Sequence, residues 1–186
     1  MDLFEYILVI TSVVYALAMA QVLSGIGRLT QTETTIRWFI PHAVWVAWLF
    51  TLIPLSWWAG WEHRDIQWVF PKFLYTLITP IFFYFATSLI IPQRVEGQEF
   101  DLEKYFFKIR RPVLLSVFVA MLAQYADGPL LSNEPVWFPL RIVQLVVLCA
   151  ILGGAFATSK RLQAVLSIGL LCSTTYTILT RLWLPG

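Results

Sequence analysis

Polar side chains that interrupt long apolar runs are the residues of this 186-residue chain best placed to do chemistry. An ionisable or amide side chain inside a membrane is costly unless it faces protein or water, so each one marks a point where an ion or solute could pass. The candidates for such a polar path are Glu5, Ser12, Gln21, Arg28, Gln124, Asp127, Arg141, Gln144, Thr174, Thr177 and Arg181.

The two charges that flank the first apolar run have two interpretations. Glu5 and Arg28 lie within one broad arc of a helix that turns 100° per residue. They either mark the two mouths of a polar path or extend to opposite membrane interfaces while the rest of the helix packs. We keep both interpretations.

Polar residues near the C-terminal half also carry alternatives. Asp127 and Arg141 are expected near the same outer surface, where they would form an ion pair that closes that end of the bundle. Such a pair serves structure or function. Thr174 and Thr177 either line a water-filled cavity or donate hydrogen bonds back to their own helix.

Motifs of known chemistry do not occur in this sequence. There is no HExxH, GxSxG, P-loop or GxGxxG, no pair of intramembrane aspartates, and no Cys/His spacing typical of a metal site. The sequence therefore predicts no catalytic residue, cofactor or metal, and an enzyme is less favoured than other classes. A net charge of +2, spread along the chain, does not indicate a nucleic-acid partner.

Composition defines the elements that must position these residues. Hydrophobic residues make up 59% of the chain, charged residues 13%, and the mean hydropathy is +0.72. Soluble domains have about 45–50% apolar and about 25% charged residues. We therefore expect an all-α membrane protein, a six-transmembrane-helix bundle in one domain over residues 1–186, with spans at about 6–28, 38–60, 71–91, 112–127, 138–159 and 162–184.

The fourth span is short, and an amphipathic segment precedes it. Residues 100–111 place apolar side chains at helical spacing with lysines and arginines on the other side, and Asp101 is a plausible N-cap. This pattern predicts an interfacial amphipathic helix that leads into the fourth span. The span itself is expected to stop at Asp127, because Gly128 and Pro129 follow.

Small residues recur every fourth position along the first span. This ladder of Ser12, Ala16, Ala20 and Ser24 allows a second helix to approach closely. The partner helix belongs either to the same chain or to another copy.

Basic residues set the predicted orientation. The loops after the first, third and fifth spans hold nine lysines and arginines, and the opposite side holds four. The positive-inside rule then places both termini outside a cell inner membrane.

Several short strings resemble a known family. Phe4-Glu5-Tyr6, Gln21-x-Leu23-x-Gly25-x-x-Arg28-Leu29, Trp57-Trp58 and Arg110-Arg111 are similar to an uncharacterised family of small bacterial multi-pass inner-membrane proteins. The resemblance covers most of the first 112 residues. It implies a bacterial multi-pass protein and brings no activity with it.

Three functions follow from the sequence. The first is a channel or transporter for an ion or small solute that acts as a homo-oligomer in the lipid bilayer. The alternative is a non-catalytic accessory or scaffold subunit that associates with another membrane protein. The least favoured is an intramembrane lipid-binding protein or enzyme that uses the outer loop from Glu62 to Asp65.

Overall fold

The computed structural model describes residues 3–131 and 139–179, without the side chains of residues 139–141. Helices dominate this part of the chain, which confirms the all-α prediction apart from two short strands. In chain order the elements are α1 (Leu3–Gln31), β1 (Thr35–Arg37), α2 (Ile40–Ala59), η1 (Gly60–His63), α3 (Phe70–Thr76), α4 (Ile78–Ile90), β2 (Glu99–Asp101), α5 (Leu102–Leu131), α6 (Pro139–Phe156) and α7 (Lys160–Thr177).

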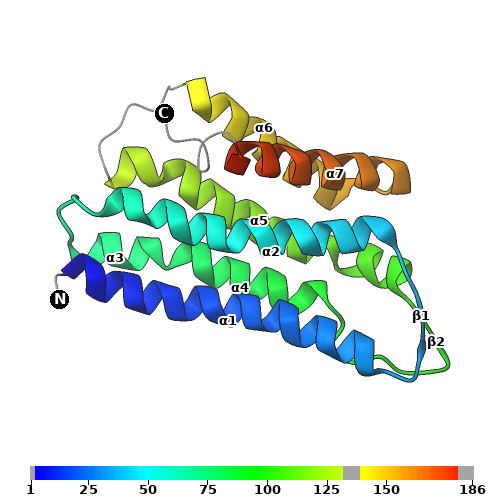
Figure 1. The fold of residues 1–186 in the computed structure, drawn as a ribbon. Helices are drawn as coiled ribbons and strands as arrows, with labels where there is room; N and C mark the ends of the chain where they lie inside the picture. The colour runs from blue at the N-terminus through cyan, green and yellow to red at the C-terminus, as the bar shows by residue number, and fades with distance from the viewer. Residues whose placement is uncertain (1–2, 132–138, 180–186) are drawn as a thin grey trace.

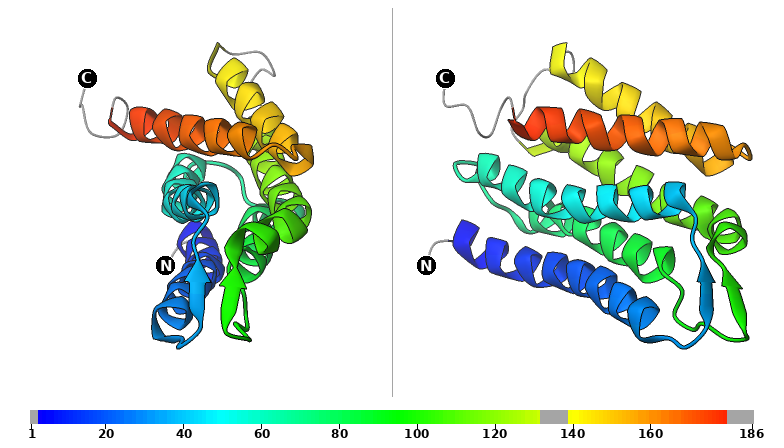
Figure 2. Two further views of the ribbon diagram at one scale, coloured as in Figure 1. Left: turned by 90° about the vertical axis from the view of Figure 1, so that its right-hand side faces the viewer. Right: turned by 45° about the vertical axis from the view of Figure 1, so that its right-hand side comes forward.

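The chain passes back and forth along one bundle, with α3 and α4 following one another in a single pass (Figure 1). As a result, α1 begins at the same end of the bundle where α7 ends. Helix α4 packs against α1 and α5, and α5 packs in turn against α6. Helix α2 contacts both α1 and α7, and Figure 2 shows it lying between them.

Helix α1 presents one apolar stripe to the bundle. Its buried residues follow a spacing of three and four, which keeps them on one face of an α-helix. Its opposite face exposes large apolar side chains such as Val13 and Leu17, a surface that suits lipid better than water. The buried stripe consists of Phe4, Ile7, Thr11, Tyr15, Ala18, Val22, Gly25 and Leu29.

The pass predicted at 71–91 consists of two helices. Pro71 lies in the first turn of α3, where a missing N–H costs little. Pro80 cannot donate to the carbonyl of Thr76, and the chain changes from α3 to α4 at Leu77. At this change the Leu77 N–H donates to the carbonyl of Leu74, three residues earlier, at 3.3 Å. This turn is tighter than that of an α-helix.

Helix α5 joins the predicted interfacial helix and the fourth span into one element. The Asp101 carboxylate accepts backbone N–H bonds from Glu103 at 2.9 Å and Lys104 at 3.1 Å, which confirms the predicted N-cap. The predicted stop at Asp127 is wrong, because α5 continues to Leu131. Packing against α4 and α6 overrides the breaker sequence, and the Lys72 ammonium donates to the Leu131 carbonyl at 2.8 Å.

Two strands that the sequence did not predict join the starts of α2 and α5. Strands β1 and β2 pair in parallel, with Thr35 opposite Glu99 and Arg37 opposite Asp101. The Arg37 guanidinium lies 3.7 Å from the Asp101 carboxylate. Each strand has only three residues, too few for an alternating pattern to be visible in the sequence.

Three helical segments of the described residues are long and apolar enough to cross a membrane. They are Leu3–Gln31, Ile40–His63 and Phe70–Ile90, and Ile142–Phe156 is a shorter apolar helix. These segments support a membrane protein.

Candidate functional site

Helix α2 supplies indole donors to the helices on both sides of it. Trp57 donates to the Ser12 hydroxyl of α1 at 2.7 Å. Trp48 donates to the Thr174 hydroxyl of α7 at 3.0 Å. Two polar-path candidates are thus hydrogen-bonded to tryptophans that the sequence analysis did not select, and each bond fixes a different helix interface.

Two further candidates, Gln124 and Gln21, also form interhelical bonds. The Ser56 hydroxyl donates to the Gln124 side-chain oxygen at 3.3 Å, linking α2 to α5. The Gln21 amide lies 3.4 Å from the Tyr84 hydroxyl, between α1 and α4. Each of these four candidates therefore forms a hydrogen bond with one side chain of another helix.

Asp127 is different, because it stands among aromatic hydroxyls. The Tyr75 hydroxyl, from α3, donates to the Ala123 carbonyl at 2.5 Å and is close enough to interact with the Asp127 carboxyl. Tyr15 of α1 is close enough to interact electrostatically with the same carboxyl, and its side chain is buried. Two tyrosines, from α1 and α3, thus lie close enough to interact with one partly buried carboxyl of α5.

The groups that act on Asp127 are phenols. Among the described side chains, no lysine, arginine or histidine is one of the groups that act on this carboxyl. The predicted partner, Arg141, has a side chain outside the described part of the structure, so the Asp127–Arg141 pair stays a prediction. A partly buried carboxyl whose neighbours are hydroxyls can bind a proton or a cation.

The other candidates lie at helix ends or outside the described residues. Glu5 is exposed in the first turn of α1, and Arg28 is partly exposed in its last turn. Gln144 is partly exposed on α6. Thr177 donates to the Ser173 carbonyl at 3.0 Å, the back-bond that was the alternative to a pore-lining role. Arg181 lies beyond the described residues.

The small-residue ladder faces away from the rest of the chain. Ala16, Ala20 and Ser24 are exposed, and Ser12 is partly covered by its bond to Trp57. The face that packs within the bundle is the stripe around Ala18 and Val22, both fully buried. Within the described residues, the ladder positions Ala16, Ala20 and Ser24 therefore lie outside the packed face of α1.

The loop after α2, from Glu62 to Asp65, begins in a short helix. The residues from Gly60 to His63 form the short helix η1, and the Arg64 guanidinium stacks over Trp61 with 5.6 Å to the ring centroid. Within the described residues, no three His, Cys, Asp or Glu side chains are grouped closely enough to hold a metal ion.

Gln163 is one of several buried polar residues that were not among the candidates. It is fully enclosed, accepts from the Trp45 indole at 3.0 Å, and donates to the carbonyls of Gly154 at 2.7 Å and Ala157 at 3.1 Å. The sequence signal that could have indicated Gln163 was an amide three residues after the start of a helix, α7, that closely follows the end of α6.

No family model, curated protein or solved structure matches this chain. Function must therefore be argued from the arrangement of these side chains.

Proposed function

We propose that this protein moves an ion or small solute across a bacterial inner membrane as a homo-oligomer, and that Asp127 is the group that binds what is moved. The observation that carries the proposal is the partly buried carboxyl of Asp127 on α5, which interacts with Tyr75 of α3 and Tyr15 of α1. A carboxyl that is partly buried in a membrane bundle is costly to keep, so a functional role is its default explanation.

The topology that we propose is six spans with both termini outside. It is supported by the back-and-forth course of the chain, with the start of α1 and the end of α7 at one end (Figure 1), and by the bias of basic residues toward the other end. In this arrangement Asp127 lies toward the outer side, about one helical turn from the end of α5. Cysteine labelling from the two sides of the membrane tests the orientation.

Flux through proteoliposomes tests the transport proposal. The purified chain is reconstituted with a pH-sensitive dye inside, and proton, Na⁺ and K⁺ gradients are applied in turn. We expect Asp127→Asn to lower the flux at least tenfold, because the amide keeps the shape but cannot carry a charge or exchange a proton. Asp65→Asn, in an exposed outer loop, is the matched control and retains flux.

Two results contradict the proposal. One is a wild-type flux equal to that of empty liposomes for every gradient. The other is an Asp127→Asn variant whose flux equals that of the Asp65→Asn control.

The exposed ladder favours a second function, that of a non-catalytic scaffold subunit. Ala16 and Ala20 leave a smooth strip on α1 against which a helix of another membrane protein can pack. Purification from native membranes distinguishes the two functions, since a scaffold co-purifies with a different chain and a homo-oligomer contains only this one.

A further inference from the structure

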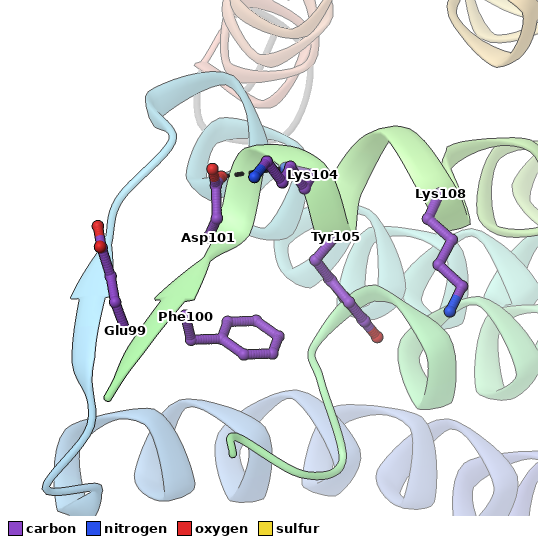
Figure 3. Close-up of a pocket in the computed structure, with 6 residues that line it drawn as sticks. All are labelled: Glu99, Phe100, Asp101, Lys104, Tyr105 and Lys108. Carbon is purple, nitrogen blue, oxygen red and sulfur yellow. Dashed lines mark hydrogen bonds between the residues drawn. The ribbon is translucent and has the colours of Figure 1, made fainter. Parts of the chain in front are cut away.

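A cavity at the start of α5 lies far from Asp127. It has a volume of about 360 Å³ and opens where β2 meets the helix (Figure 3). With a rise of 1.5 Å per residue, Lys104 and Asp127 are about 35 Å apart along α5. The cavity is therefore independent of the proposed transport site. Its lining residues are Glu99, Phe100, Asp101, Lys104, Tyr105 and Lys108.

Two lysines and two carboxylates line this cavity, so its net charge is zero and its cationic part is formed by the lysines. Lys104 and Lys108 are exposed and stand one helical turn apart, on the same face of α5. The carboxylate of Asp101 is already engaged by the backbone of α5 and by Arg37 at 3.7 Å. Glu99 shares the Asp101 face of β2, and Phe100 lies on the other face (Figure 3).

The floor of the cavity is aromatic and leads to an apolar surface. The rings of Phe100 and Tyr105 lie 5.9 Å apart between centroids. The Tyr105 hydroxyl donates to the carbonyl of Leu89 at 2.7 Å, so this wall of the cavity reaches the end of α4. An exposed apolar stripe of Ile81, Phe85 and Leu89, at one-turn spacing, runs along α4 to that point.

Cationic side chains thus adjoin an apolar stripe on α4, which with α3 forms a segment, Phe70–Ile90, that is long enough to span a membrane. Two ammonium groups one turn apart suit a phosphate, which they can bind as point charges. An apolar stripe that begins beside them suits an acyl chain. Free phosphate offers only the first of these contacts, whereas a phospholipid offers both.

We propose that this cavity binds the phosphate head group of an anionic phospholipid, with Lys104 and Lys108 on the phosphate and an acyl chain along Ile81, Phe85 and Leu89. The site lies at the end of the bundle that carries the excess of basic residues. On the topology proposed above, that end faces the anionic cytoplasmic leaflet. The lipid site does not depend on transport.

Native mass spectrometry of the purified full chain with dioleoyl phosphatidylglycerol tests the head-group contacts. We expect the double variant K104Q/K108Q to bind this lipid at least tenfold more weakly than wild type. The matched control is R94Q/R161Q, which removes two exposed charges from the same end of the bundle and outside the cavity. We expect it to change affinity less than twofold.

Equal losses in the two double variants overturn the proposal, because they mean that the lipid responds to overall charge and not to the cavity. Unchanged affinity of K104Q/K108Q overturns it as well. Circular dichroism and thermal unfolding confirm that each variant is folded, as expected for exposed side chains exchanged for glutamine.

A second comparison separates lipid from free phosphate. We expect the double variant F85A/L89A to weaken dioleoyl phosphatidylglycerol at least fivefold and to leave the short-chain dihexanoyl lipid unaffected. Inorganic phosphate and glycerol phosphate should compete only at concentrations at least a hundredfold higher than the lipid. Competition by inorganic phosphate at the lipid's own concentration overturns the lipid assignment, as does an F85A/L89A variant with wild-type affinity.

Discussion

The indole N–H of Trp45 donates a hydrogen bond of 3.0 Å to the side-chain oxygen of Gln163, across 118 positions of the sequence. The same amide donates to the carbonyls of Gly154 and Ala157 at the end of α6. One fully buried side chain therefore joins α2, α6 and α7 and satisfies carbonyls near the turn between α6 and α7.

Replacing Gln163 with leucine is expected to destabilise the fold by about 1–3 kcal/mol, because an indole N–H and two carbonyls lose their partner in the interior. Thermal unfolding in detergent measures the change. Gln31→Leu, at the exposed end of α1, is the control and should alter stability by less than about 0.5 kcal/mol. Combining Gln163→Leu with Trp45→Phe should cost less than the sum of the two, since both remove the same bond. Strict additivity would contradict this coupling.

Two glycines of α1 should respond in opposite ways to alanine. A Cβ at Gly25 would lie 2.8 Å from the Ile91 side chain, where α1 and the end of α4 meet, so Gly25→Ala should destabilise by about 1–3 kcal/mol. A Cβ at Gly27 would meet no atom within 4 Å, and alanine favours a helix, so Gly27→Ala should stabilise by up to about 1 kcal/mol. Equal unfolding temperatures for the two variants would show that α1 does not approach Ile91 this closely.

Asp101 should make stability depend on pH in the acid range. The backbone N–H of Lys104, followed by that of Glu103 and the charge of Arg37, holds the pKa of this carboxyl below its ordinary value of 3.8. A carboxyl whose pKa is lower in the folded state stabilises the fold above the unfolded pKa, and this contribution disappears as the pH falls through the folded pKa. We expect the unfolding temperature of the wild-type protein to fall as the pH is lowered below about 4.

Two variants of Asp101 distinguish the effect of its charge from the effect of its hydrogen bonds to the backbone of α5. Asp101→Asn keeps an oxygen that can cap α5 but has no titratable group. The part of the acid destabilisation that comes from Asp101 should therefore be absent in this variant. Asp101→Ala should be less stable than Asp101→Asn at neutral pH, because two backbone N–H groups lose their acceptor. An Asn variant with the acid response of wild type would assign that response to another carboxyl.

Helix periodicity explains why much of the fold could be predicted. The apolar runs gave the helices, and Asp101 ahead of Leu102 gave the start of α5, because capping depends on residues close in sequence. The continuation of α5 through Gly128 and Pro129 was missed, since packing against distant helices determines it. Strands β1 and β2 pair across more than sixty residues, and nothing local in their three residues each indicates that register.

The hydrogen-bond partners of the polar side chains could not be predicted from local sequence either. Ser12, Gln124 and Thr174 were selected as candidates for a polar path, which stays a prediction, and each is hydrogen-bonded to a side chain of α2. Their partners, Trp57, Ser56 and Trp48, could not be predicted, because the choice depends on how α2 is rotated against its neighbours. Gln163 was overlooked for that reason as well.

The ladder of α1 predicts different outcomes for two neighbouring alanines. Ala20 is exposed and Ala18 is fully buried, so leucine at the two positions adds the same volume to opposite faces of one helix. Ala18→Leu should lower stability by about 1–3 kcal/mol, because the packed stripe has no room for it. Ala20→Leu should leave the unfolding temperature of the single chain unchanged and weaken self-association, since the close helix approach is lost. Crosslinking in nanodiscs against protein density measures the association. Wild-type association of Ala20→Leu would show that the ladder faces lipid, and unfolding of that variant would place the ladder inside the bundle.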